Sequence, residues 1–215
     1  MKSRKIIIIG DSAFAEIAYE YFTYDSEYEV VAFAVESEYK KREELFGIPV
    51  VPFENVENIY APADHGFYAA LVYTQGNSLR SRLFMEAKAK GYAPVSYLSS
   101  RAFVWRNVEI GEHCFIFENN VIQPFVHIGD DVVLWSGNHI GHHSKIGSHT
   151  FVSSHVVVSG FVNVGESCFL GVNSSIANNT NVGSRCVLGA GAVVIGDVPD
   201  DTTAVGVWKK PKIEK

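Results

Sequence analysis

The sequence predicts a small α/β domain with parallel strands, followed by a solenoid built from very short parallel strands. In the first 95 residues, apolar runs of strand length alternate with segments of helical spacing, which is typical of a parallel sheet covered by helices. From residue 98 to 199 an aliphatic residue recurs at every sixth position, a period that no helix produces. We therefore expect domains at 1–95 and 96–208, with a basic tail at 209–215.

The N-terminal elements follow from apolar patterning and from the residues that end each segment. The expected strands are Lys5–Ile9, Glu29–Val35 and Phe67–Tyr73, and the expected helices are Ala13–Phe22 and Ser78–Lys90. The turn Gly10-Asp11-Ser12 would lie at the carboxyl edge of the sheet and at a helix N-terminus, where phosphate groups bind. Because Ser12 and Ala15 stand where a G-x-G-x-x-G fingerprint would carry its second and third glycines, no nicotinamide cofactor is expected.

Two positions in each six-residue repeat accept only a narrow range of side chains. Every sixth residue from Leu98 to Val194 is Leu, Ile or Val, and the residue four positions later is always small or slender. Both rows are expected to point inward, with successive strands stacked about 4.8 Å apart. The three cysteines fall on the slender row, which predicts core packing and neither disulfides nor a zinc site, at Cys114, Cys168 and Cys186.

Composition narrows the class of protein. A net charge of −6 and a pI near 5.7 argue against a nucleic-acid partner. No apolar run reaches membrane-spanning length, and the first run, Ile6–Ile9, is too short for a secretory leader, so we expect a cytoplasmic protein without membrane insertion. Several aromatic residues of the solenoid are expected to be exposed and to favour self-association: Phe117, Phe125, Trp135, Phe151 and Phe161.

The hexapeptide pattern [Leu/Ile/Val]-Gly-x-x-[small]-x resembles that of the left-handed parallel β-helix acyltransferases. A leading Ile6–Ile9 strand with Gly10-Asp11-Ser12 before the repeats is similar to the sialic acid O-acetyltransferase and nucleotide-amino-sugar N-acetyltransferase family. The resemblance implies a left-handed β-helix, acetyl-CoA as acyl donor and a nucleotide-linked amino-deoxy sugar as acceptor. It also implies a homotrimer with active sites between subunits, and a role in surface glycans such as lipopolysaccharide O-antigen.

The segment Gly141-His142-His143-Ser144-Lys145-Ile146-Gly147 resembles the family segment whose first histidine is the catalytic base. A neutral imidazole at His142 would take the proton that a sugar amine or hydroxyl loses as it attacks the thioester, with no metal expected. His143 stands where the family has an acid, so His139 or Asn138 is expected to orient the base. Gly160 aligns with the glycine whose amide binds the oxyanion.

The resemblance also implies the remaining contacts. Substrate contacts are expected from Gly10, Asp11, Ser12, Glu36, Asn77, Trp135, Asn138 and His143. Coenzyme A contacts are expected from Phe151, Gly160, Gly171, Gly189, Ala190, Trp208, Lys209 and Lys210. Phe151 replaces a second family histidine near the thioester. Trp208 either stacks on adenine or closes the last coil, and both interpretations stay open.

Three other functions compete with N-acetylation. O-acetylation of a sialic acid or related sugar differs only in the acceptor atom. A zinc-dependent lyase like the γ-class carbonic anhydrases is disfavoured, because Gly147 and Ser148 stand five residues after His142 and His143, where that motif needs histidine. A non-catalytic binding module is the third. His113, Asp131 and His149, spaced 18 apart, form either a metal site or, more ordinarily, an exposed polar ladder.

Overall fold

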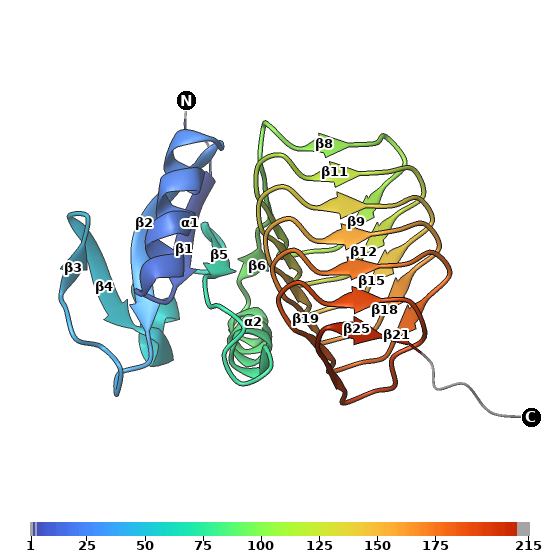
Figure 1. Ribbon diagram of the computed structural model, residues 1–215. Coiled ribbons are helices and arrows are strands. Elements are labelled where there is room, and N and C mark those ends of the chain that lie inside the picture. Colours follow the sequence, from blue (N-terminus) through green and yellow to red (C-terminus); the bar gives the residue numbers. More distant parts are fainter. Residues whose placement is uncertain (1, 3, 210–215) are drawn as a thin grey trace, which may run out of the picture. The chain divides into compact units, whose positions relative to one another are not determined.

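The computed structural model describes residue 2 and residues 4–209, which form two compact units (Figure 1). The first unit runs to Thr74 and includes Leu79–Tyr97. The second unit contains the short segment Gln75–Ser78 and the chain from Leu98 onward. The chain therefore passes from the first unit to the repeats two residues later than the sequence suggested.

The first unit is a six-stranded sheet in the order β3-β4-β2-β1-β5-β6. Its strands are β1 (Arg4–Ile9), β2 (Tyr28–Val35), β3 (Glu44–Leu45), β4 (Ile48–Pro52), β5 (His65–Ala69) and β6 (Ala93–Pro94). Its helices are α1 (Ala13–Tyr24), α2 (Ser78–Ala89) and the 3₁₀ helix η1 (Phe53–Asn58). All neighbouring strands are parallel except β3 and β4, which confirms the predicted parallel α/β sheet.

Burial explains which elements the sequence revealed. Ile6 to Ile9 of β1 are almost completely buried, and α1 buries one face through Phe14, Ala15, Ala18 and Phe22. The third expected strand lies earlier, as β5, because the chain leaves the sheet after Ala69. Strands β3 and β4 were not predicted, since they form a hairpin with only two paired residues on each strand, closed by Phe46 and Gly47 at positive φ.

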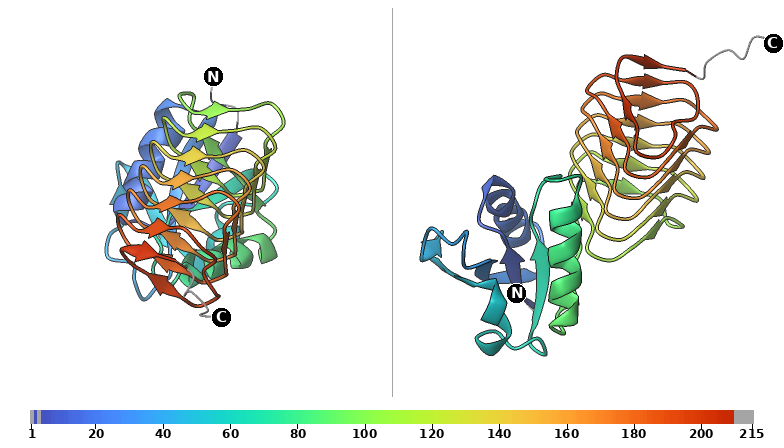
Figure 2. Two further views of the ribbon diagram at one scale, coloured as in Figure 1. Left: turned by 45° about the vertical axis from the view of Figure 1, so that its right-hand side comes forward. Right: turned by 90° about the horizontal axis from the view of Figure 1, so that it is seen from below.

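The second unit is a left-handed parallel β-helix with three faces, which confirms the fold expected from the repeat (Figure 2). The first face contains β7 (Tyr97–Leu98), β10 (Phe115–Ile116), β13 (Val133–Leu134), β16 (Phe151–Val152), β19 (Phe169–Leu170), β22 (Val187–Leu188) and β24 (Thr203–Ala204). The second face contains β8 (Phe103–Val104), β11 (Val121–Ile122), β14 (His139–Ile140), β17 (Val157–Val158), β20 (Ser175–Ile176), β23 (Val193–Val194) and β25 (Val207–Trp208). The third face contains β9 (Glu109–Ile110), β12 (His127–Ile128), β15 (Lys145–Ile146), β18 (Asn163–Val164) and β21 (Asn181–Val182).

Paired residues on each face lie 18 apart, as in Val121 opposite His139, so three hexapeptides make one coil. From Ile116 to Val194 the aliphatic row is buried in one continuous core. The first three members of the row are less buried: Leu98 is 47% exposed, and Val104 and Ile110 are half-buried. They belong to the first coil, which pairs with a coil on one side only. The periodic pattern therefore identifies the core correctly except at its open end.

The slender row is buried as expected, and its polar members bind the backbone of the next coil. Ser144 Oγ donates to the Ser159 carbonyl at 2.8 Å and accepts from the Val162 amide at 3.1 Å. Buried polar groups without partners would destabilise the core, so bonds of this kind offset the burial of Ser144 and join two successive coils. Ser174 differs, because its buried hydroxyl has no hydrogen-bond partner among the described residues. This explains why serine, threonine and asparagine are tolerated on an inward row.

The aromatic residues of the solenoid are less uniform than the sequence suggested. Phe125 and Phe161 are exposed, at 59% and 50%. Phe117 and Phe151 are buried, and Trp135 is half-buried, stacked on Phe117 with ring centroids 4.6 Å apart. The expectation that all five are exposed is therefore wrong for Phe117 and Phe151, because hexapeptide spacing places outward residues without showing what covers each face.

Candidate active site

His142 lies on the corner that joins β14 to β15. Its backbone N–H donates to Gln123 Oε1 at 2.9 Å, and its side chain is exposed. The imidazole lies directly against Gly160, one coil further on: a Cβ at residue 160 would be 2.7 Å from His142 Cε1 and 2.8 Å from Nε2. Because glycine has no side chain, residue 160 provides the space in which the imidazole lies.

His143 supplies the hydrogen-bond partner of the His142 ring. The two Nδ1 atoms lie 3.1 Å apart, and the two rings are nearly perpendicular. The residue bonded to the His142 ring is therefore His143, and not His139 or Asn138 as expected. Asn138 is buried and binds backbone groups instead, accepting the Val156 amide at 2.7 Å.

The His143 ring is held between two aromatic rings. Its centroid lies 4.6 Å from that of Phe125 and 4.7 Å from that of Phe161, both in stacked geometry. Phe161 also meets His142 edge-on at 5.1 Å. Sequence reasoning missed this stack, although residues 125, 143 and 161 are spaced by one coil, and that spacing was the available signal.

The amide of Gly160 already has an acceptor in this structure. It donates to Asn178 Oδ1 at 2.9 Å, and Asn178 is exposed, 18 residues later in the sequence. An oxyanion bound at this amide would replace the Asn178 oxygen. The role of Gly160 in oxyanion binding stays a prediction, and Asn178 is a neighbour that sequence reasoning did not identify.

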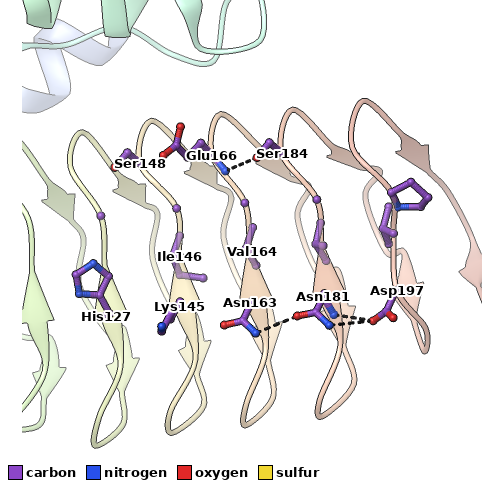
Figure 3. Close-up of a pocket in the computed structure, with 17 residues that line it drawn as sticks. His127, Lys145, Ile146, Ser148, Asn163, Val164, Glu166, Asn181, Ser184 and Asp197 are labelled. Atoms are coloured by element: carbon purple, nitrogen blue, oxygen red, sulfur yellow. Dashed lines mark hydrogen bonds between the residues drawn. The ribbon is translucent and has the colours of Figure 1, made fainter.

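A groove of about 700 Å³ follows the third face, and Lys145, three residues after His142, is one of its lining residues (Figure 3). Asn163 Nδ2 donates to Asn181 Oδ1 at 2.9 Å, and the Asn181 amide donates to Asp197 Oδ1 at 2.9 Å. Lys145 brings a positive charge to a lining that also contains Glu166 and Asp197. The groove therefore has charged groups of both signs beside apolar side chains such as Val164, and His142 is not among its lining residues.

The expected coenzyme A residues do not line this groove. Gly171, Gly189 and Ala190 lie on corners between the first and second faces, and Phe151 is a buried residue of the first face. Trp208 packs against the core, and its Nε1 donates to the Asp197 carbonyl at 3.1 Å, as expected for a residue that closes the last coil. Lys209 is exposed, and Lys210 lies outside the described residues.

In the first unit, the expected substrate residues gather at the carboxyl ends of β1 and β2. Gly10 has a φ of 112° and donates its N–H to the Ala34 carbonyl at 2.8 Å, a backbone conformation that favours glycine. Asp11 pairs with Arg42 at 3.4 Å, and Ser12 precedes α1 as its N-cap residue, without a side-chain capping bond. The sheet edge predicted for Gly10-Asp11-Ser12 is therefore observed.

Glu36 follows β2 and forms a bidentate ion pair with Arg82, with both nitrogen–oxygen distances at 3.0 Å. Arg82 also contacts Glu86 at 3.1 Å, and these acceptors raise the pKa of its guanidinium group. Glu36 is thus held in one orientation at the edge of the sheet, with both of its carboxylate oxygens bound to Arg82.

Two other expected substrate residues are buried. Asn77 belongs to the second unit, is fully buried and donates its side-chain amide to the Cys168 carbonyl at 3.0 Å. Asn138 is 1% exposed. Neither side chain offers a surface to a ligand, so neither enters the proposed site. Trp135 lies on a different corner of its coil from His142.

The ladder of His113, Asp131 and His149 differs from the exposed ladder expected. Asp131 accepts from both imidazoles, with each Nδ1 2.9 Å from a carboxylate oxygen, and His113 and Asp131 are fully buried. Among the described residues, no group of three or more His, Cys, Asp or Glu side chains is arranged to hold a metal ion. The ladder is therefore a hydrogen-bonded chain between successive coils, buried at His113 and Asp131 and partly exposed at His149.

The second unit is a β-helix of hexapeptide repeats, and comparisons with known proteins agree on this fold. The family model for the bacterial transferase hexapeptide (six repeats) matches residues 107–141 and 125–160. None of the curated proteins matches the sequence. No helix in the described part of the chain is both long and apolar enough for a membrane crossing.

Solved structures share the fold over almost the whole chain. The acetyltransferase domain of PglB from Neisseria gonorrhoeae has a TM-score of 0.85 at 23% identity, covering 95% of this chain and 97% of that one. PerB from Caulobacter crescentus, solved with CoA and GDP-perosamine, has a TM-score of 0.82 at 24% identity, covering 94% of each chain. WeeI from Acinetobacter baumannii has a TM-score of 0.64 at 20% identity, covering 95% of this chain and 97% of that one. The expected resemblance is confirmed at the level of the fold.

Proposed function

We propose that this protein is an acetyl-CoA-dependent N-acetyltransferase that acts on an amino-deoxy sugar linked to a nucleotide, in the synthesis of surface glycans. The observation that carries the proposal is the exposed His142 imidazole on a β-helix corner, packed against Gly160. The fold adds support, because PglB has been solved with acetyl coenzyme A and PerB with CoA and GDP-perosamine. Acetyl-CoA would be the donor here as well.

The chemistry is direct transfer. The sugar amine attacks the thioester carbonyl carbon, a C–N bond forms, and His142 Nε2 takes the proton that the nitrogen loses. The tetrahedral intermediate then collapses, the C–S bond breaks, and coenzyme A leaves as its thiol after receiving a proton from the imidazolium. The Gly160 amide would stabilise the oxyanion once Asn178 Oδ1 gives up its bond to that amide.

The first unit would bind the nucleotide. The Gly10-Asp11-Ser12 turn presents the start of α1, where backbone N–H groups favour phosphate, and Glu36 lies at the adjacent strand end. We place the protein in the cytoplasm. We also propose a homotrimer, since the exposed rings of Phe125 and Phe161 beside His142 form an apolar surface that a neighbouring subunit would cover. Light scattering of the purified protein tests the trimer.

The test of activity is incubation with acetyl-CoA and amino sugars linked to UDP, dTDP or GDP, with release of the free CoA thiol as readout. His142→Ala should reduce turnover by about 10²- to 10⁴-fold, the usual contribution of a general base. His155→Asn is the matched control, because His155 is an exposed histidine on a different corner at a φ of 59° that asparagine tolerates. Absence of turnover with every acceptor would overturn the activity, and full activity of His142→Ala would overturn the base.

The acceptor atom needs a separate measurement. A base placed as His142 is would serve a hydroxyl as readily as an amine, so O-acetylation of sialic acid or a related sugar is the second candidate. An amide product survives mild alkali, whereas an ester product is hydrolysed. An alkali-labile product would reassign the enzyme to O-acetylation with the same base.

A further inference from the structure

We propose that His143 is a positioning residue that holds His142 in the tautomer whose Nε2 is free to accept a proton. This inference rests on the proposed role of His142 as base. Its first support is the hydrogen bond between the two rings, whose Nδ1 atoms are 3.1 Å apart. One hydrogen atom must lie between these nitrogens. Which of the two nitrogens carries it determines whether His142 Nε2 can accept a proton from the substrate.

The two arrangements have opposite consequences. If His142 Nδ1 carries the hydrogen and His143 Nδ1 accepts it, the lone pair of His142 Nε2 is available to the substrate. If His143 donates instead, neutral His142 carries its hydrogen on Nε2 and has no lone pair there. Both rings are exposed, so exposure does not select between the two arrangements. Only the first leaves the Nε2 lone pair that the proposed base requires, and we therefore assign the Nδ1 hydrogen to His142 and the accepting Nδ1 to His143.

The second support is the way in which the His143 ring is fixed. Phe125, His143 and Phe161 occupy the same corner position of three successive coils, with φ values of 63°, 59° and 58°. This shared backbone conformation directs the three side chains alike, and the His143 ring lies between the other two at 4.6 and 4.7 Å. A ring held on both faces keeps its Nδ1 pointing at His142.

The stack also affects the charge that forms during transfer. When His142 takes the substrate proton, its Nδ1–H bond to His143 becomes charge-assisted and therefore stronger. Part of the positive charge is drawn toward a ring that lies between two aromatic faces, which attract cations. His143 with its two phenylalanine neighbours would thus stabilise the imidazolium without a carboxylate.

Two substitutions separate the hydrogen bond from the stack. His143→Phe keeps an aromatic ring between Phe125 and Phe161 and removes the acceptor. His143→Asn removes the ring and keeps an acceptor, because Asn Oδ1 is as many bonds from Cβ as His Nδ1, and asparagine tolerates the positive φ. We expect His143→Phe to lower kcat by about tenfold or more, with both KM values within about twofold, and His143→Asn to retain at least about a third of kcat.

The tautomer itself can be observed without substrate. Nitrogen-15 NMR of histidine-labelled full-length protein, assigned with His142→Ala and His143→Phe, should show a protonated Nδ1 and an unprotonated Nε2 on His142. In His143→Phe the His142 signals should move toward a mixture of both tautomers. A protonated Nε2 on wild-type His142 would overturn the inference, whether or not an acceptor sugar has been found.

The kinetic outcomes distinguish this inference from the proposed function. If His142→Ala is inactive while His143→Phe keeps full kcat, His142 is the base and His143 does not position it. If His142→Ala is fully active, the base assignment fails first. A fall in kcat for both His143 variants, with unchanged thermal stability, would show that the ring stack and not the acceptor is what matters, and would overturn the proposed tautomer control.

Discussion

The imidazole of His142 occupies the space where a side chain on Gly160 would begin, with Cε1 2.7 Å from that Cβ position. Gly160 is not at positive φ, so alanine fits its backbone and the only conflict is with the ring. Gly160→Ala should displace the imidazole and reduce kcat by about tenfold or more. The free energy of unfolding should change by less than about 1 kcal/mol, because the exposed ring can move away.

The check is a double-mutant cycle with His142→Ala, followed by kinetics and chemical denaturation. Once the imidazole is gone, alanine at 160 should cost nothing further in stability. An equal loss of stability in both backgrounds would mean that residue 160 conflicts with the backbone of the coil instead.

The sequence was sufficient for the architecture and for the position of His142, because both depend on local repetition. The six-residue period places each inward residue, and the 18-residue coil places His142 over Gly160. It was not sufficient for the contacts around them. That Phe125 and Phe161 hold His143, and that Asn178 binds the Gly160 amide, depends on side-chain rotamers, which periodicity does not determine.

Burial was the other quantity that the pattern could not supply. His113 and Asp131 are outward by their place in the repeat, yet both are fully buried. Asn77, which the resemblance implies as a substrate contact, is likewise buried, with its side-chain amide bound to the Cys168 carbonyl. A repeat period gives the direction of a side chain within its own coil and says nothing of what lies beyond it.

Asn138 is expected to contribute to stability and not to substrate binding. Its amide donates to the Trp135 carbonyl and accepts the Val156 amide, and the side chain is 1% exposed. Asn138→Ala should lower the free energy of unfolding by about 1–3 kcal/mol, because it leaves buried backbone groups without partners. Urea denaturation measures this, with Asn163→Ala as control.

Asn163 forms a comparable amide contact, to Asn181 at 2.9 Å, but on the exposed third face, so its loss should cost less than about 0.5 kcal/mol. Both variants should keep their KM for the nucleotide sugar. A raised KM in Asn138→Ala alone, at unchanged stability, would restore Asn138 to the substrate site.

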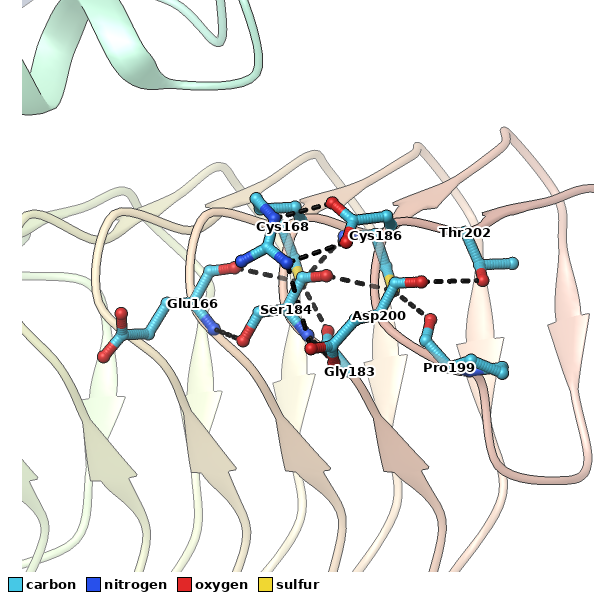
Figure 4. Close-up of polar contacts among 10 residues, drawn as sticks. Glu166, Cys168, Gly183, Ser184, Cys186, Pro199, Asp200 and Thr202 are labelled. Atoms are coloured by element: carbon cyan, nitrogen blue, oxygen red, sulfur yellow. Dashed lines mark hydrogen bonds and ion pairs between the residues drawn. The ribbon is translucent and has the colours of Figure 1, made fainter.

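Cys168 should be unreactive and should make stability depend on pH under alkaline conditions. Burial raises the pKa of its thiol to about 12, and the thiol donates to the Gly183 carbonyl at 3.1 Å (Figure 4). In the unfolded chain the thiol ionises near its ordinary value of 9.0. Below that pH it is protonated in both states, so stability is unaffected, and above it the unfolded state is favoured progressively until about pH 12.

The measurement is denaturation between pH 8 and 11 for the wild type and Cys168→Ala. The wild type should lose more stability over this range than the variant. At pH 8 a thiol reagent should leave Cys168 unlabelled in the folded protein and react with it only after the protein unfolds. Rapid labelling of the folded protein at Cys168 would contradict the burial on which this pH dependence rests.

Glu36 provides the prediction for the first unit, where the proposed nucleotide would bind at the ends of β1 and β2. Glu36→Ala removes a carboxylate that Arg82 holds at 3.0 Å, and should raise the KM for the nucleotide sugar while leaving that for acetyl-CoA unchanged. Because the pair is partly exposed, the stability change should stay within about 1 kcal/mol. The matched control is Glu57→Ala, which removes a similarly exposed carboxylate paired with Lys90 in the same unit, and should alter neither KM. If Glu36→Ala and Glu57→Ala behave alike in steady-state kinetics, the Glu36–Arg82 pair is a surface ion pair and the nucleotide is bound elsewhere.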